Sequence, residues 1–127
     1  MDKREKVYKF KKDHYVKTRG GNSHFMDLYC SGCNNHLLLY QKDGQGSLLR
    51  LYLDRIFEPQ ELAVLQSTCN TKSQIPNLKC STCQKLIAIP MVYKQENRLA
   101  FSLVPGSFVK KKSKGVYPPD ESKKKGD

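Results

Sequence analysis

Apolar residues in this chain come in short runs separated by turn-forming residues, a pattern typical of β-strands. The clearest alternation covers residues 47–56, where side chains of opposite character fall on the two faces of a strand: Leu49, Leu51 and Leu53 against Arg50, Tyr52 and Asp54. Further strands are predicted at residues 24–29, 37–40, 86–93, 98–104 and 108–110. A helix of one or two turns is expected over residues 59–65, with Pro59 in its first turn.

Glycine and proline mark the breaks between these runs. Asp43-Gly44-Gln45-Gly46 predicts a hairpin turn, because both residue types tolerate the backbone angles that such turns require. Residues 67–77 are polar and predict a loop, and Pro90 indicates an edge position or a bulge within its strand. Together, the alternation and the turn signals predict a small, mostly β fold.

Four of the five cysteines form two matching hooks, Cys30-Ser31-Gly32-Cys33 and Cys80-Ser81-Thr82-Cys83. A spacer of two residues lets both sulfurs of a hook bind one metal ion, and two hooks supply the four thiolates of a structural zinc site. Each hook lies between two predicted strands, as in a zinc ribbon. A site closed by four sulfurs leaves no coordination position for a substrate, so the predicted zinc ion is structural rather than catalytic.

Other interpretations of the cysteines stay open. The hooks suit an iron centre as well, and a single C-x-x-C pair is also the redox motif of thioredoxin-like proteins, although neither hook precedes a clear helix. His24, His36 and Cys69 are alternative ligands, but four cysteines already complete the site.

The positive charge is concentrated at the two ends of the 127-residue chain, whose net charge is +11. Residues 1–20 carry a net charge of +5 and residues 106–127 a net charge of +4, whereas residues 21–105 carry only +2. At this length one domain is expected. We predict a basic N-terminal segment at 1–20, a zinc-binding β domain at 21–109 and a disordered lysine-rich tail at 110–127, the two ends being flexible.

The first residues are charged and are not followed by an apolar run, so no signal peptide is expected. No stretch reaches the roughly 18 apolar residues of a membrane span, so no membrane association is expected either. These features predict a cytoplasmic protein. In a reducing compartment, paired cysteines are more often metal ligands than disulfides.

The two hooks, the strand-rich insert between them and the strands that follow resemble the Mss4-like, or β-tent, group of zinc folds over roughly residues 25–109. That group includes the zinc-bearing methionine-R-sulfoxide reductases, the Rab-binding Mss4 protein, Yippee-type domains and the RNA-binding C-terminal domains of RIG-I-like receptors. The resemblance implies a zinc-stapled β-sheet scaffold. It does not imply the reductase activity, because those enzymes place a nucleophilic cysteine after the second hook and here none follows Cys83.

Three functions remain open at this stage, and the preferred one is non-enzymatic binding of RNA, DNA or a ribonucleoprotein. Lysines would neutralise phosphates and aromatic rings would stack on unpaired bases. The candidate residues lie in both basic ends: Tyr8, Lys9, Phe10, Lys11, Lys12, Lys110, Lys111 and Lys112. The alternative is an adaptor that binds a protein through Tyr52, Tyr93 and Phe101, and the third is a thiol redox role for Cys69.

Overall fold

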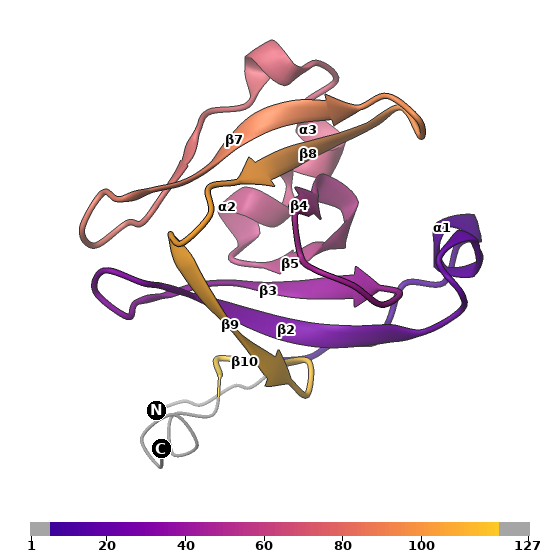
Figure 1. Cartoon of the computed structure of the whole chain (residues 1–127), viewed down its shortest axis with the longest axis horizontal. Helices are drawn as coiled ribbons and strands as arrows, with labels where there is room; N and C mark the ends of the chain where they lie inside the picture. Colours follow the sequence, from indigo (N-terminus) through magenta and orange to yellow (C-terminus); the bar gives the residue numbers. More distant parts are fainter. Residues whose placement is uncertain (1–5, 120–127) are drawn as a thin grey trace.

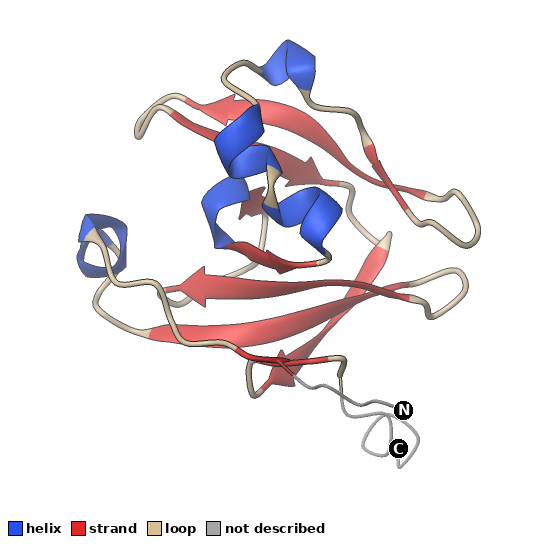
Figure 2. Ribbon diagram, turned by 180° about the vertical axis from the view of Figure 1, so that it is seen from behind, coloured by secondary structure: helices blue, strands red, loops and turns tan. Residues whose placement is uncertain are grey.

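The computed structural model describes residues 6–119, in which two four-stranded antiparallel β-sheets face each other across a leucine-rich core (Figure 1). A third, two-stranded sheet joins the two ends of the described chain. Short helices lie at one side of the space between the sheets, as the view from behind shows (Figure 2). The mostly β class is confirmed. The longest helix of the described chain has five residues, far short of the length needed to traverse a bilayer.

The first sheet has the strand order β5-β3-β2-β9. Its members are β2 (Ser23–Cys30), β3 (His36–Asp43), β5 (Ile56–Glu58) and β9 (Phe108–Ser113). The strands β2 and β3 form a hairpin whose turn contains the first cysteine hook. Among the described strands, β9 pairs only with β2 and forms one edge of the sheet.

The second sheet has the strand order β4-β8-β7-β6. Its members are β4 (Arg50–Tyr52), β6 (Leu78–Lys79), β7 (Leu86–Tyr93) and β8 (Arg98–Leu103). The strands β6 and β7 form a hairpin around the second hook. Because β6 has only two residues, β7 has no strand partner among residues 6–119 on that side beyond Ala88, and Pro90 lies on this unpaired stretch. The predicted edge position of Pro90 therefore agrees with the structure.

The hairpin predicted at residues 43–46 does not form. The strand β3 pairs with β2 and β5, so both of its edges are occupied, and the chain crosses from Asp43 to β4 in the other sheet. The predicted strand over residues 47–56 is also interrupted, by a 3-10 turn η1 at Leu53–Arg55. Its leucine alternation holds in part, since Leu51 and Leu53 are buried while Leu49 is 61% exposed.

The helical prediction is confirmed and extends further along the chain. The helices α2 (Gln60–Ala63) and α3 (Leu65–Thr68) follow Pro59, and a 3-10 turn η2 (Lys72–Gln74) lies within the predicted loop. Leucines of α2 and α3 pack against the core, which explains why this polar segment folds back between the sheets.

The two basic ends are ordered further than the sequence suggested. The strand β1 (Lys6–Val7) pairs with β10 (Val116–Tyr117), and a short helix α1 (His14–Thr18) precedes β2. The lysine-rich stretch from residue 110 to 113 belongs to β9 rather than to a disordered tail.

These ends are ordered because they cover the outer face of the first sheet. The ring of Phe10 stacks on that of Phe25, with 4.4 Å between the ring centres, and the ring of Tyr8 packs edge-on against that of Phe57, with 5.0 Å between their centres. The segments at 1–5 and 120–127 lie outside the described residues, and the domain boundaries proposed from the sequence stay a prediction.

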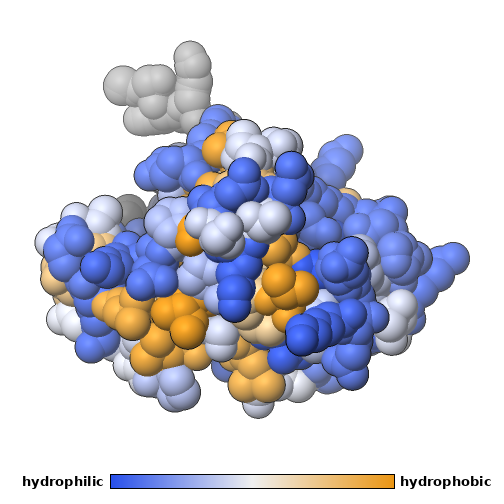
Figure 3. Space-filling model, turned by 90° about the horizontal axis from the view of Figure 1, so that it is seen from above, coloured by the Kyte–Doolittle hydropathy of each residue, from blue (hydrophilic) through white to orange (hydrophobic). Residues whose placement is uncertain are grey.

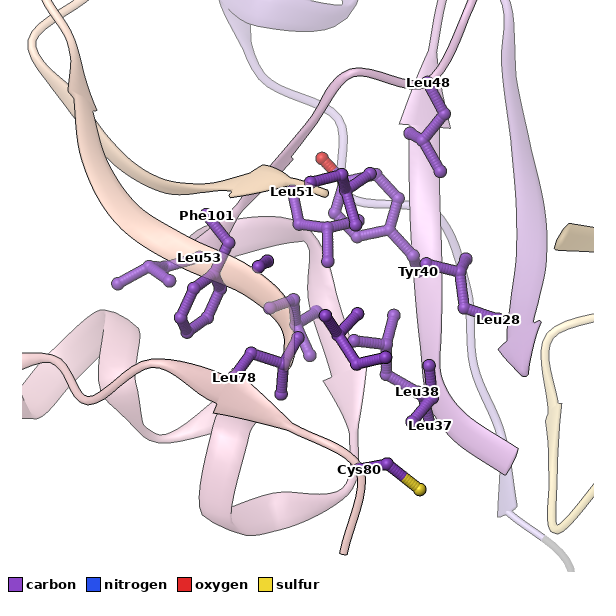
Figure 4. Close-up of a cluster of buried hydrophobic side chains, with 14 of the residues drawn as sticks. Leu28, Leu37, Leu38, Tyr40, Leu48, Leu51, Leu53, Leu78, Cys80 and Phe101 are labelled. Carbon is purple, nitrogen blue, oxygen red and sulfur yellow. The ribbon is translucent and has the colours of Figure 1, made fainter. Parts of the chain in front are cut away.

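The main core lies between the two sheets and is built largely from leucine (Figure 4). Leu28 and Leu38 enter it from the first sheet, and Leu51 and Phe101 from the second; all four are fully buried. Cys80 stands at one end of this cluster, so the second hook continues directly from the core.

A buried arginine fixes the N-terminal segment to the domain. Arg55 is 1% exposed; its Nη1 and Nη2 donate to the Asp13 carboxylate at 3.0 and 2.7 Å, and its Nε donates to Asp43 at 2.8 Å. Gln41 lies two residues before Asp43 on β3. Its side chain accepts a hydrogen bond from the backbone N–H of Lys11 at 2.7 Å and donates one to the Lys11 carbonyl at 3.0 Å. Residues 11–13 therefore lie in a fixed position against the first sheet.

Candidate metal centre

The four hook cysteines meet at one edge of the molecule. The turn between β2 and β3 and the turn between β6 and β7 lie next to each other, at the left of Figure 1. The four sulfurs of Cys30, Cys33, Cys80 and Cys83 all lie within 4.8 Å of one another. The sequence prediction that the hooks converge is confirmed.

The two turns have the same backbone geometry. In the first, the Asn34 amide donates to the Cys30 carbonyl and the Cys30 amide to the Asn35 carbonyl, both at 2.8 Å, and the equivalent positions of the second repeat both bonds at 2.9 Å. The residue after each hook adopts a positive φ, 65° at Asn34 and 67° at Gln84. This tight turn points both sulfurs of a hook to the same side.

The sulfur separations fit a tetrahedral ion. Cys30 Sγ lies 3.6 Å from Cys83 Sγ, and Cys33 Sγ lies 3.5 Å from Cys80 Sγ. Tetrahedral zinc with Zn–S bonds of roughly 2.3 Å places its sulfurs about 3.8 Å apart. A disulfide requires about 2.05 Å, and all five cysteines are free thiols. Both hooks run into strands rather than helices, unlike a thioredoxin-type pair.

The site is buried on its inner side and open on its outer side. Cys30 and Cys80 are 1% and 0% exposed, whereas Cys33 and Cys83 face solvent. Burial alone would raise the pKa of Cys80, but hydrogen bonds from the backbone of Cys83 and Thr82 and from neighbouring thiols lower that pKa to about 6. Cys80 therefore has a preference for the thiolate form, which is the form that binds metal.

The close approach of the four sulfurs makes it unfavourable for all of them to be thiolates at once. A backbone hydrogen bond from Asn35 acts to lower the pKa of Cys33, but the partial loss of hydration at its thiol and the adjacent sulfurs outweigh it and raise that pKa to about 12. Four thiolates at this separation repel one another strongly unless a cation lies between them. The donor set therefore fits a divalent soft-to-borderline metal such as zinc.

Two side chains connect the hooks on their periphery. The Asn35 amide nitrogen lies 3.9 Å from Cys80 Sγ, so the first hook contributes a donor to a sulfur of the second. The stem of Lys85 passes close to Gly32, since a Cβ at Gly32 would lie 3.5 Å from Lys85 Cδ. Both lysines that flank the second hook, Lys79 and Lys85, are exposed.

The alternative ligands lie away from this cluster. His36 Nε2 binds Asp27 Oδ1 at 2.8 Å, and its ring packs against Tyr29. His24 lies in the first half of β2, remote in sequence from its cysteine end. The Cys69 thiol is buried and donates to the Gln74 carbonyl at 3.7 Å. Within residues 6–119, the four hook cysteines form a candidate site without them.

The candidate nucleic-acid residues fall into two groups. Tyr8, Phe10 and Lys11 are occupied by contacts within the domain: the Tyr8 hydroxyl binds the Glu58 carboxylate, and Lys11 Nζ binds the Asp54 carbonyl at 2.6 Å. The others are exposed lysines: Lys9, Lys12, Lys110, Lys111 and Lys112. The last three are consecutive on the edge strand β9.

Sequence reasoning missed a second group of basic residues, at the crossing between β3 and β4. Arg19, Lys42 and Arg50 line one cavity there together with Arg55. They come from four separate segments without a shared motif, so only the folded chain brings them together. Comparison with known protein families, with curated proteins and with solved structures finds no match to this chain.

Proposed function

We propose that this chain is a non-enzymatic binding protein of the cytoplasm, in which one structural zinc ion supports a surface that binds single-stranded RNA or DNA. The metal proposal rests on the four converged thiols and their tetrahedral spacing. Zinc bound there has no open coordination position, so it stabilises the fold and does not activate water or substrate. Free thiols suit a reducing compartment.

A β-tent scaffold of the Mss4-like kind is the fold proposal that accompanies this function. Two antiparallel sheets facing each other, with one hook at a hairpin turn of each, support it. The ion would then tie the sheets together at one edge, where the core ends at Cys80.

The lysines of β9 carry the nucleic-acid proposal. Lys110, Lys111 and Lys112 are exposed, and none of them forms an ion pair with a carboxylate of residues 6–119. Because they alternate across a strand held by β2, they present positive charge on both sides of a rigid sheet edge. Phosphates bound to them would release counterions, which is the main source of affinity in such complexes.

Lys9 and Lys12 extend this surface from the N-terminal segment. The Tyr8 amide donates to the Gly115 carbonyl at 2.8 Å, so the chain before Lys9 runs beside the turn that follows β9. The rings of Tyr8 and Phe10 are packed on the first sheet, and we therefore assign affinity to the lysines rather than to stacking on these rings.

Replacing Lys110, Lys111 and Lys112 by glutamine tests this proposal. We expect the affinity for a labelled 20-nucleotide single strand of RNA or DNA to fall about 50-fold at 0.15 M salt, and the slope of log K against log salt to become about 2 less negative. Fluorescence anisotropy over a salt series measures both quantities. Deleting the ends would be a poorer test, because residues 6–18 and 108–117 contain folded elements.

The matched control replaces Lys17, Lys72 and Lys94 by glutamine. These lysines are exposed and removed from β9, and the change in net charge is the same. Equal losses in both triple variants would show that only net charge matters. Unchanged binding in the β9 variant would reject the proposed surface and leave the lysines the simpler role of keeping an open sheet edge from pairing with other chains.

A second candidate function is that of a protein-binding adaptor. Exposed apolar side chains favour it: Ile89 and Leu86 on β7 are 44% and 38% exposed, and Figure 3 shows hydrophobic side chains gathered among polar ones on the face seen from above. Of the anchors expected from the sequence, Phe101 is fully buried and Tyr52 is 8% exposed, so both act within the domain. Loss of a protein partner on replacing Leu86 and Ile89 by lysine would support the adaptor.

A further inference from the structure

A cavity of about 260 Å³ lies where the chain crosses from β3 to β4. Its wall is formed by the end of β3, the crossing loop, the start of β4 and Arg19, which follows α1. It is separate from the cysteine hooks, which occupy the other end of the β2–β3 hairpin. The proposed functions use none of the cations that line it.

Lys42 is a buried ammonium group without a counterion in this cavity. Lys42 is 9% exposed, and its Nζ donates hydrogen bonds to the carbonyl oxygens of Gly44 and Gln45, both at 3.3 Å. No carboxylate of residues 6–119 forms an ion pair with it. A buried charge without a partner is costly, so an anion would be bound favourably here.

Arg50 adds a second cation with unused donors. Its Nε donates to the Tyr52 hydroxyl at 3.2 Å, and its guanidinium lies 4.3 Å from the centre of the Tyr93 ring. Within the described part of the chain, its two terminal nitrogens form no hydrogen bond or ion pair. A guanidinium held over a ring in this way keeps its terminal N–H groups available to bind an oxyanion through two parallel hydrogen bonds.

The acidic group in the wall is already neutralised. Asp43 accepts hydrogen bonds from Ser23 at 2.7 Å and from Gln41 and Arg55 at 2.8 Å. Arg19 is paired with Glu96 through two bonds of 2.9 Å. The carboxylates around the cavity therefore do not compete for Lys42.

Two tyrosine hydroxyls supply further protons. The Tyr40 hydroxyl accepts from the Tyr52 amide at 2.8 Å, and the Tyr52 hydroxyl accepts from Arg19 at 3.0 Å and from Arg50. Each hydroxyl acts as an acceptor in these bonds, which leaves its own proton for a ligand. The unused groups of the cavity are thus donors, as a ligand rich in acceptors requires.

We propose that this cavity binds a small oxyanion, with phosphate or a phosphate monoester as the ligand class, through Lys42, Arg50 and the hydroxyls of Tyr40 and Tyr52. The cavity volume falls below the usual range of drug-sized pockets. It admits a tetrahedral anion with a small organic group. Burial and the positive charges of Arg19 and Lys110 lower the pKa of Lys42 despite Asp43, a repulsion that a bound anion would offset.

Titration of the full zinc-loaded chain with inorganic phosphate at constant ionic strength, followed by amide NMR shifts, tests this site. We expect saturable shifts confined to the backbone around residues 19 and 40–52. Lys42→Met should weaken phosphate binding at least 10-fold, since the variant loses the charged hydrogen bond from the ammonium group to the anion. Lys72→Met, at an exposed lysine of η2, is the matched control and should bind like the wild type.

Arg50→Lys is a second variant that keeps the charge but removes the bidentate geometry, and it should also weaken binding. Retention of zinc and an unchanged amide spectrum outside the cavity show that each variant is folded. Glycerol 2-phosphate, titrated in the same way, separates the sources: tighter binding than phosphate assigns the site to a monoester, and weaker binding assigns it to the free ion.

Shifts that fail to saturate, or equal affinity in the wild type and Lys42→Met, would overturn the proposal. The outcome can be distinguished from that of the nucleic-acid proposal, because the triple glutamine variant of β9 retains every residue that lines the cavity and removes only the repulsion between Lys110 and Lys42. That variant should still bind phosphate in a saturable manner while losing nucleic acid.

Discussion

Replacing Cys80 by serine is expected to abolish zinc binding and to unfold the domain cooperatively. Cys80 is fully buried at the end of the main core, and a serine hydroxyl is a poor zinc ligand. A structural zinc ion contributes on the order of 10–16 kcal/mol of apparent free energy in small domains. The whole stability of a domain is about 5–15 kcal/mol, so its loss leaves little to hold the two sheets together.

The closure of the chain between the hooks explains why the effect is large. Joining the hooks costs about 3.4 kcal/mol in loop-closure entropy, which the metal offsets severalfold. Elemental analysis and circular dichroism of the variant measure metal content and folding. Cys69→Ser is the matched control, because this buried thiol lies outside the cluster, and it should retain both metal and fold. A folded, metal-free Cys80→Ser protein would show that the core alone suffices.

Replacing Arg55 by methionine is expected to lower the free energy of unfolding by about 3–5 kcal/mol. The guanidinium is buried between Asp13 and Asp43, and its removal leaves the Asp43 carboxylate, with a side chain 4% exposed, without a cation. Urea denaturation measures the loss. Lys72→Met, at an exposed site, should change stability by no more than about 0.5 kcal/mol.

A further variant separates the ion pair from packing. Adding Asp13→Asn and Asp43→Asn to Arg55→Met removes the stranded charges and should restore part of the stability, because a neutral pocket no longer holds an unpaired carboxylate. A loss below 1 kcal/mol in Arg55→Met, or no recovery in the triple variant, would contradict this account of the buried network.

The same ion pair gives stability a dependence on pH. The hydrogen bond from Arg55 lowers the pKa of Asp13, although burial acts in the opposite direction. Because the folded carboxyl has the lower pKa, its contribution is fully present above the unfolded value of about 3.9 and is lost as pH falls through the folded value. Arg55→Met should therefore flatten the acid side of the stability profile.

The hooks could be predicted from sequence because their chemistry is local. Two residues between the cysteines of each pair are enough to specify a shared ion, and the tight turns at Asn34 and Gln84 follow from that spacing. The crossing after Asp43 could not be predicted, because it depends on which strand occupies the free edge of β3. The Asp-Gly pair correctly marked the end of a strand, but the hairpin predicted from it does not form.

The ordering of the basic ends depends on contacts that are distant in sequence. Asp13 meets Arg55 across 42 positions, and Lys6 pairs with Tyr117 near the other end of the chain. Composition predicts flexibility for such segments, because it contains no information about the apolar face of the first sheet that these segments cover. The cavity around Lys42 was missed for the same reason, since its cations share a location and not a motif.

X-ray absorption spectroscopy at the zinc edge of the purified protein decides whether the four hook cysteines alone hold the ion. One zinc per chain with four sulfur neighbours at about 2.3 Å, and no nitrogen or oxygen neighbour, is the predicted result. A folded protein without metal, or a zinc shell that includes nitrogen or oxygen, would contradict a closed four-cysteine site.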